Sequence, residues 1–554
     1  MGSIVFYLNL SLYISVMEQD KSHVLVIGSG GAGIRAAIEA SKYGETVLVS
    51  KTLLGKGGCT TMAEGGYNAV MRDCDNCEDH YEDTMKGGAY LNEPNLVRAL
   101  TNEAPDRMKD LINWGAVFDV TPECTIAQRP FGGQRFPRTC FAGDRTGHEM
   151  IVTLSEHLRA TSVRIYEEIS IISLLTDDGR VTGALGIERS GEMRAFLADA
   201  TILATGGGTR IYDISTNSSS GTGDGYALGY RAGAVLIDME QVQFHPTGAV
   251  YPYDARGRLV TEAVRGEGGI LLNTKGERFM SKYDPERMEL STRDVVARSI
   301  ATEILSGNGT ERGGVYLDVS HLPAKTIEER LPVMLEQFLA YGVDIRTEPM
   351  EVAPTAHHMM GGLKISEEGL TSIPGLYACG EVSGGVHGAN RLGGNALAET
   401  QVFGKRAGES AGKSRESEKV LPINQVNDQE KRLQAFYHGD IQPVVVEMEL
   451  RQQMWQKAGI FRTAKDLEVV GKAIENLAVM NMKASSGENL AGCCTVQNMY
   501  CTASLVVNSA LIRKESRGAH VRKDIRQDWD ALNSPFGHTW ISLTSSGAEM
   551  RRNL

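Results

Sequence analysis

The first fifty residues alternate between short apolar runs and a helical pattern. Residues 23–27 and 46–49 are compact apolar runs, and residues 34–43 between them are rich in small and apolar residues. Short apolar runs bounded by turns are typical of buried strands, whereas a longer segment of this composition favours a helix. The order predicts a β-α-β unit of a parallel sheet.

Further strands are expected much later in the chain. The segments 181–187, 201–205 and 376–379 are apolar, and the last two run directly into glycines. Because strands of one sheet then lie on both sides of a long insertion, the dinucleotide-binding domain is expected to be discontinuous. The predicted division is an N-terminal extension 1–20, a first domain part 21–238, an inserted domain 239–350, a second domain part 351–407, a linker 408–427, a helical domain 428–515 and a tail 516–554.

The segment 428–515 has apolar residues at helical spacing and no glycine motif with evident chemistry. We interpret it as a helical packing module. The preceding residues 408–427 are polar and charged, which is typical of a linker. The apolar positions that suggest the helices include Leu433, Phe436, Val444, Val446, Met448 and Leu450.

Composition narrows the functional class. The chain has 554 residues, a net charge of −12 and no basic run with interleaved aromatics, which argues against nucleic-acid binding. Nine irregularly spaced cysteines indicate a reducing compartment, and we expect a cytoplasmic protein. Cys74 and Cys77 form a single CxxC without a second pair, so no metal site is predicted.

The first sixteen residues are apolar but lack the basic start and cleavage site of a signal peptide. They are also short for a membrane span. We therefore expect Met17 to be the working start. No other segment reaches the roughly 18 apolar residues of a spanning helix, so no membrane anchor is expected in this chain.

A glycine fingerprint follows the first predicted strand. It comprises Gly28, Gly30, Gly31, Ala32 and Gly33. Placed between a strand and a helix, it indicates a dinucleotide whose pyrophosphate lies at the helix N-terminus. A nicotinamide cofactor would want an acidic residue at the end of the second strand. That strand ends in Ser50-Lys51, which weakens the nicotinamide interpretation and leaves FAD open.

Imidazole, hydroxyl, carboxylate and guanidinium groups gather in turn-rich segments further along. His245 is followed by Thr261, Glu262 and Arg265, and the segments around His357 and at residues 387–393 carry similar polar side chains. Two carboxylates of a small dicarboxylate need two cationic or hydrogen-bonding grips. Taken singly, each of these residues could be structural: His245 a core histidine, or Glu262 and Arg265 a helical ion pair.

The ordered motifs resemble those of the flavoprotein subunits of succinate dehydrogenases and fumarate reductases, over residues 22–525. They lie at 63–66, 144–148, 222–225, 243–248, 261–269, 387–393 and 515–520. The resemblance implies an α/β Rossmann-like, discontinuous FAD-binding domain, an inserted α+β capping domain and a C-terminal helical domain. It also implies that the substrate lies between cap and flavin.

The same resemblance assigns roles to the polar residues. Arg391 and His357 would hold one carboxylate of fumarate or succinate, and His245 and Thr261 the other. Arg293 would deliver the proton. Because an arginine seldom gives up its proton, a relay is needed, and Glu262 and Arg265 match it.

Flavin contacts are likewise implied by the resemblance. Membrane-bound relatives usually attach FAD to a histidine where this chain has Cys59. We therefore expect non-covalent FAD, with a thioether link as the alternative, and a lower flavin potential that favours fumarate reduction. Besides the fingerprint, the implied contacts are Ser50, Lys51, Gly58, Cys59, Thr60, Gly65, Gly66, Asp224, His358, Glu381, Arg391, Ala396 and Leu397.

Alternatives within and outside the family remain. L-aspartate oxidases carry a glutamate at the position of Phe131, which therefore argues for a dicarboxylate without an amino group. The overall likeness is greatest to the soluble thiol-dependent fumarate reductases of methanogens, which draw electrons from coenzyme M and coenzyme B. No ferredoxin-like cysteine run is present, so an iron–sulfur partner subunit is expected. A succinate dehydrogenase and a flavin-holding subunit without catalysis are the other interpretations.

Overall fold

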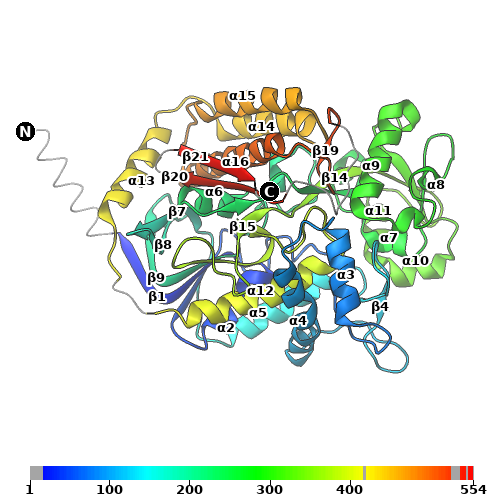
Figure 1. The fold of residues 1–554 in the computed structure, drawn as a ribbon, viewed down its shortest axis with the longest axis horizontal. Helices are drawn as coiled ribbons and strands as arrows, with labels where there is room; N and C mark the ends of the chain where they lie inside the picture. Colours follow the sequence, from blue (N-terminus) through cyan, green and yellow to red (C-terminus); the bar gives the residue numbers. More distant parts are fainter. Residues whose placement is uncertain (1–16, 416–418, 526–536, 545–546, 553–554) are drawn as a thin grey trace, which may run out of the picture.

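The computed structural model describes residues 17–415, 419–525, 537–544 and 547–552 (Figure 1). Its first sheet has the strand order β6-β2-β1-β9-β8-β7, with β16 pairing with β9. Strands β6, β2, β1, β9 and β16 run parallel, and β8 and β7 continue the sheet antiparallel. The bounds are β1 Glu18–Ile27, β2 Thr46–Val49, β6 Arg164–Tyr166, β7 Ser170–Asp177, β8 Arg180–Ile187, β9 Met193–Leu203 and β16 Leu376–Ala378.

Pairing of β16 with β9 makes this domain discontinuous, because the chain leaves the sheet after β9 and returns to it more than 150 residues later. The predicted fold class is confirmed. The expected strand 23–27 is longer, since β1 begins at Glu18, so residues 18–20 belong to the sheet and not to an extension. Residues 1–16, and the expectation about them, lie outside the described residues.

Helix α2, Gly31–Ala40, and helix α12, Asn395–Gly412, pack closely beside the sheet (Figure 1). Glycines allow this approach. A Cβ at Gly404 would lie 2.7 Å from the carbonyl oxygen of Ala32, and one at Gly408 would lie 2.4 Å from that of Ala36. The helix bounds differ from the expected ones. Helix α2 begins within the fingerprint, three residues before the expected start at residue 34, and α12 extends into the expected linker 408–427.

The remaining elements of the first domain surround the sheet. Its helices are α3 Cys77–Gly87, α4 Pro94–Asn113, α5 Thr146–Arg159 and α6 Asp224–Arg231. Short strands β3 Tyr67–Asn68, β4 Gln128–Arg129 and β5 Thr139–Cys140 form a separate sheet. The second part of the domain also holds β15 Gly362–Lys364 and β17 Ser383–Gly384.

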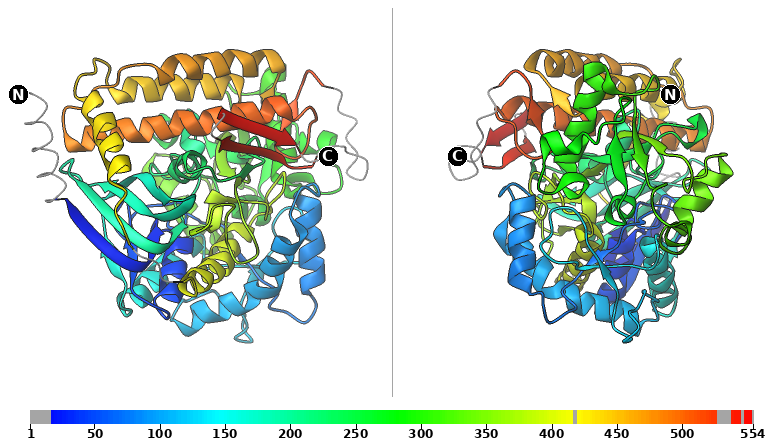
Figure 2. Two further views of the ribbon diagram at one scale, coloured as in Figure 1. Left: turned by 60° about the vertical axis from the view of Figure 1, so that its left-hand side comes forward. Right: turned by 90° about the vertical axis from the view of Figure 1, so that its right-hand side faces the viewer.

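The inserted segment forms its own apolar core around a four-stranded antiparallel sheet of order β11-β14-β13-β12. Figure 1 shows it as a lobe at the right-hand side, and in the right view of Figure 2 this lobe faces the viewer. Its strands are β11 Val242–Ala249, β12 Ile270–Leu272, β13 Val315–Asp318 and β14 Met350–Met359. Its helices are α7 Glu262–Gly266, α8 Met280–Tyr283, α9 Arg293–Glu303, α10 Ala324–Arg330 and α11 Pro332–Ala340.

The C-terminal part is helical, as its spacing predicts. It consists of α13 Ile423–Phe436, α14 Pro443–Lys457, α15 Ala464–Ala478 and α16 Gly487–Ile512, the last three lying side by side (Figure 1). All six apolar positions lie on helices; Leu433, Phe436, Val446 and Leu450 are buried, whereas Val444 and Met448 are exposed. The short pair β18 Phe461–Arg462 and β19 Val521–Arg522 completes this part.

Two features depart from the sequence-based division. The expected tail contains a hairpin, β20 Thr539–Thr544 and β21 Gly547–Arg552, which adds to β10 Leu236–Ile237 of the first domain. Among the described residues, α16 alone is long and apolar enough to cross a membrane, although no anchor was expected. Because 61% of its most apolar window is buried and it packs on α14, α15 and α6, we assign it to the core.

Candidate flavin and substrate site

One long cavity extends from the turn between β1 and α2 to the inserted domain. Nearly every residue predicted from the sequence to bind cofactor or substrate contributes to its walls. These are Gly28, Gly30, Gly31, Ala32, Ser50, Lys51, Gly58, Cys59, Thr60, Gly65, Gly66, Phe131, Asp224, His245, Thr261, Glu262, Arg293, His357, His358, Glu381, Arg391, Ala396 and Leu397. Two predicted residues, Gly33 and Arg265, do not reach it.

The fingerprint glycines are needed for different steric reasons. Gly28 has φ +114°, and a Cβ there would lie 2.3 Å from the carbonyl oxygen of Ala204. Gly30 meets nothing closer than 3.9 Å, which leaves its backbone open to the cavity. A Cβ at Gly33 would lie 1.9 Å from the carbonyl oxygen of Gly28. Gly33 therefore permits close packing of helix on strand and is not a cofactor contact.

The cavity is closed beyond the end of β2 by the helical domain. Lys51 Nζ donates to Asp224 Oδ2 at 3.1 Å and to Thr495 Oγ1 at 2.9 Å. Asn498 Nδ2 donates to Asp224 Oδ1 at 2.7 Å. Thr495 and Asn498 lie three residues apart on α16, on one face, and both line the cavity. Neither residue was predicted as part of the site, because nothing in the sequence of the helical domain indicates a role there.

Cys59 lies in the same cavity with its thiol enclosed. The Sγ atom donates a hydrogen bond to the side-chain oxygen of Asn217. Burial, and secondarily the charge of Glu381, raise the pKa of the Cys59 thiol to about 12. The thiolate is the nucleophilic form of cysteine. A thiol held protonated in this way is a poor partner for a covalent bond to a flavin.

At the opposite end, two histidines and an arginine face one another. The rings of His245 and His357 are 5.0 Å apart, and Arg391 Nη2 donates to His357 Nε2 at 3.1 Å. Since Arg391 can only donate, Nε2 of His357 accepts and its Nδ1 donates to Thr216 Oγ1 at 2.7 Å. Burial, reinforced by Arg293, holds the pKa of both imidazoles well below the usual value.

Gln243 joins the two guanidinium groups of the site. Its Oε1 accepts from Arg293 Nη1 and from Arg391 Nη2, each at 3.3 Å. Its Nε2 donates to the carbonyl oxygen of Arg391 at 2.8 Å, which fixes the amide orientation. Burial, reinforced by the charge of Arg293, lowers the pKa of Arg391 to about 9. Gln243 lies in the motif 243–248, but no role was predicted for it.

Arg293, Glu262 and Arg265 form a buried chain of charges. Arg293 Nε donates to Glu262 Oε2 at 2.7 Å, and Arg265 Nη2 lies 3.9 Å from the same oxygen. Glu262 Oε1 accepts from the backbone N–H of Gly132 at 2.9 Å. Burial raises the pKa of Glu262, but Arg293, Arg265 and that N–H outweigh it and lower the pKa to about 2. Arg265 lies behind Glu262, away from the cavity.

Tight packing holds this chain of charges in place. A Cβ at Gly393 would lie 2.7 Å from Phe131 Cδ2, 2.8 Å from Glu262 Oε2 and 3.0 Å from Arg293 Nη2. Only glycine therefore fits where Phe131, Glu262 and Arg293 converge. Thr261 precedes Glu262 as the N-cap of α7, and its Oγ1 accepts from the N–H of Ala263 at 3.4 Å, leaving its hydroxyl hydrogen for a ligand.

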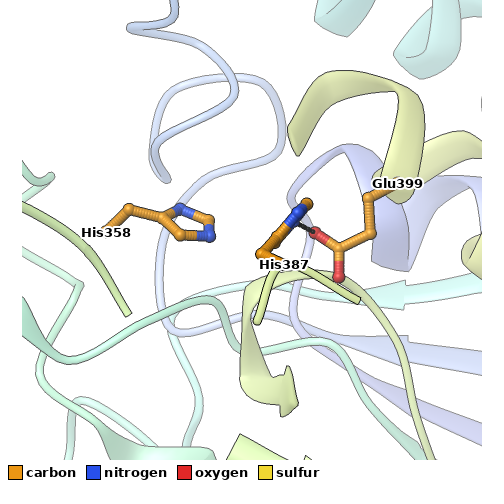
Figure 3. Close-up of side chains that lie close together, drawn as sticks. All are labelled: His358, His387 and Glu399. Atoms are coloured by element: carbon orange, nitrogen blue, oxygen red, sulfur yellow. Dashed lines mark hydrogen bonds and ion pairs between the residues drawn. The ribbon is translucent and has the colours of Figure 1, made fainter. Parts of the chain in front are cut away.

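No metal site was expected, yet the structure brings His358, His387 and Glu399 together (Figure 3). Their ligand atoms lie within 4.8 Å of one another, and two imidazoles with a carboxylate suit a divalent cation. His387 Nε2, however, lies 2.9 Å from Glu399 Oε2, and the His358 and His387 rings stack edge-on at 5.4 Å. We assign His387 and Glu399 to a hydrogen-bonded pair of the protein, of which Glu399 lines the cavity together with His358.

The residues present fit an FAD molecule. The open turn at Gly30 lies at the N-terminus of α2, where a pyrophosphate binds. Buried polar atoms on the walls lack protein partners, among them Thr205 Oγ1, His358 Nε2 and Arg391 Nε. Such atoms are costly unless a ligand or water satisfies them. The cavity thus joins a dinucleotide cradle to an end lined by Arg391, His245, His357 and the buried Arg293–Glu262 ion pair.

Comparison with known proteins agrees with this geometry. A family described as FAD binding domain matches residues 23–397, and one described as fumarate reductase flavoprotein C-term matches residues 447–551. The chain is 54% identical over 529 residues to a subunit of the fumarate reductase (CoM/CoB) of Methanothermobacter marburgensis. That match covers 92% of this chain and 96% of the relative.

Solved structures give the same result. FrdA of E. coli quinol fumarate reductase, as a glutamate-to-glutamine mutant, superposes with a TM-score of 0.91 at 35% identity, covering 97% of both chains. Mycobacterium smegmatis Sdh1 superposes with a TM-score of 0.85 at 38% identity, covering 97% of this chain and 94% of that one.

Proposed function

Because the chain belongs to the family of succinate dehydrogenase and fumarate reductase flavoproteins and is an FAD-dependent oxidoreductase, we propose that it reduces fumarate to succinate. The observation that supports this most is the convergence of Arg391, His357 and His245 on one end of the flavin cavity, with Arg293 beside them. The set offers cationic and neutral donors to two carboxylates and a proton donor between them.

The two groups of residues that would hold the carboxylates differ in charge. Arg391 supplies the permanent positive charge for one carboxylate, and His357 lies against it. Nδ1 of His245 lies 3.2 Å from both the backbone N–H and the carbonyl oxygen of Thr247. In the tautomer whose Nδ1 accepts that N–H, Nε2 donates to the other carboxylate together with Thr261. Holding both ends twists one carboxylate out of conjugation and makes the alkene electrophilic. Phe131 forms an apolar wall, which suits a substrate without an ammonium group.

When bound and reduced, FAD supplies a hydride to one alkene carbon. Arg293 gives a proton to the other carbon, which completes the addition of two electrons and two hydrogens. Glu262, in contact with Arg293 Nε, returns a proton to it, and Arg265 continues the chain away from the cavity. Burial of all three groups keeps water out and strengthens their mutual interaction.

Electrons must reach the flavin from outside this chain. We propose that they come from an iron–sulfur partner in a heterodimer or larger complex, with thiols such as coenzyme M and coenzyme B as the ultimate donors. The support is the 54% identity to a protein whose name carries those two coenzymes. Nine cysteines, none in a disulfide within the described residues, suit a reducing cytoplasm.

The test uses dye-reduced, FAD-loaded protein under anaerobic conditions. Rapid fumarate-dependent reoxidation of the flavin is expected, because the anion grips and the proton donor are already in place. Peroxide formed from L-aspartate in air serves as the comparison. No reoxidation by fumarate combined with aspartate-dependent peroxide would overturn the proposal in favour of an amino-acid oxidase, and no response to either would favour a non-catalytic flavin subunit.

We also propose that FAD is held without a covalent bond. Acid precipitation of the holoprotein is expected to release all the yellow colour into the supernatant, since the pKa of the Cys59 thiol is raised to about 12 and little thiolate exists near neutral pH. Absorbance of pellet and supernatant at the flavin bands measures the split. Colour retained in the pellet, and lost from a Cys59→Ser variant, would establish a thioether instead.

A further inference from the structure

A second cavity, of about 450 Å³, lies outside the substrate end of the first. That volume is in the range of ligand pockets, about 300–1,000 Å³. The first domain lines it with residues 61–64 and 215–217 and with the residues at the start of α5, and the inserted domain lines it with the loop 256–259 and helix α11. We call it the outer cavity.

The two cavities share a wall. Met62, Ala63, Glu64, Thr216, Asn217 and Leu259 belong to both. Thr216 is the residue whose Oγ1 contacts His357 Nδ1 at 2.7 Å. A molecule in the outer cavity is therefore separated from the substrate grips by single side chains.

Cations dominate the rim of the outer cavity. Arg145, Arg256 and Arg258 line it and are exposed, and His148 stands one helical turn from Arg145. Within the part of the chain that the structure describes, no carboxylate forms an ion pair with any of the three guanidinium groups, in contrast to most arginines of the inserted domain. The Arg258 guanidinium lies over the Tyr341 ring at 5.5 Å.

Two carboxyl groups also face the outer cavity, and neither cancels this charge. Asp144 Oδ2 accepts from the backbone N–H groups of Val333 and Met334, at 3.0 and 3.2 Å, which disperses its charge into α11. Burial, and then the charge of Asp144, raise the pKa of Glu64 well above the usual value. The cavity therefore presents unneutralised guanidinium groups to solvent and to its interior.

We propose that the outer cavity captures dianionic dicarboxylates from solution and delivers them to the inner grips, with Arg145, Arg256 and Arg258 as the attracting groups. The inference rests on the proposed function. Clustered charge of one sign in a concave site raises local substrate concentration and on-rate by about 10–1,000-fold. Because the groups are solvent-exposed, salt at about 0.5 M should screen most of the effect.

The test compares wild-type holoenzyme with the double variant Arg256→Gln/Arg258→Gln and with Arg145→Gln. At low ionic strength, kcat/KM for fumarate is expected to fall about tenfold in the double variant, with kcat unchanged. The ratio of wild type to variant should shrink toward one at about 0.5 M salt. Arg287→Gln, which removes an exposed cation of the inserted domain outside both cavities, is the matched control.

A second readout does not require turnover. Stopped-flow binding of a non-reacting dicarboxylate such as malonate, followed by the flavin spectrum, should show a lower association rate and an unchanged dissociation rate. Equal association rates, or a loss that is the same at low and high salt, would overturn the capture role. Wild-type protein that binds malonate normally but does not turn over fumarate would instead overturn the proposed function and leave capture standing.

Discussion

Arg293→Ala is expected to lower kcat for fumarate by about a thousandfold or more while FAD stays bound. The loss follows from geometry: Arg293 lines the cavity, is only 7% exposed, and is held by Glu262 at one nitrogen and Gln243 at another. A positioned general acid contributes about 100–10,000-fold, and here it also contributes positive charge beside the substrate. Steady-state kinetics with a reduced viologen dye and flavin absorbance of the purified variant measure both quantities.

Arg298→Ala provides the comparison for this variant. Arg298 lies on the same helix but pairs with Asp294 at 3.0 Å and with the carbonyl oxygen of Gly518 at 2.7 Å, away from the cavity. It should keep near-normal kcat. If Arg293→Ala retained more than about a tenth of the wild-type rate, a residue other than Arg293 would have to be the proton donor.

Glu262→Gln is expected to lower kcat about 100-fold or more and to destabilise the protein. The amide keeps the shape but removes the carboxylate, whose pKa of about 2 keeps it charged and able to neutralise Arg293 and Arg265. Breaking a buried ion pair at one partner costs about 3–5 kcal/mol, because the other charge is left uncompensated. Fumarate kinetics and urea unfolding of the holoprotein measure the two effects.

Glu303→Gln separates stability from catalysis in this experiment. Glu303 is also a buried carboxylate of the inserted domain, hydrogen-bonded to Tyr283 at 2.8 Å and to Asn273 at 3.0 Å, but it does not line the cavity. It should lose stability and keep its rate. Equal rate losses in the two variants would mean that Glu262 acts only through the fold of the inserted domain.

The glycine turn of the cofactor site could be predicted from local sequence alone. The fingerprint at Gly28–Gly33 has a recognisable spacing, and the β-α-β context is visible in a few apolar residues. Packing changed only the details, since Gly33 allows helix α2 to pack closely on the end of the strand and is not a cofactor contact. A role for Gln243 in the site could also have been predicted, because it lies two residues from His245 on the same strand and side chains two apart face the same side.

Contacts between distant segments were beyond what spacing can predict. Arg293 meets Glu262 across 31 residues, and Gln243 meets Arg391 across 148. No local period encodes such pairs, so Arg293 came from the resemblance to a family and not from its own surroundings. The outer cavity is similar: Arg145 and Arg256 share it only because two domains meet there.

The bond from Lys51 to Thr495 spans 444 residues and places α16 of the helical domain against the end of the flavin cavity. A ligand that touches both domains binds their assembled form more tightly than either alone, and it stabilises that assembly by mass action. Because Thr495 and Asn498 of α16 line the cavity, FAD bound there would stabilise the docking of the helical domain on the first domain. We therefore expect preparations with less FAD to show weaker docking of the helical domain.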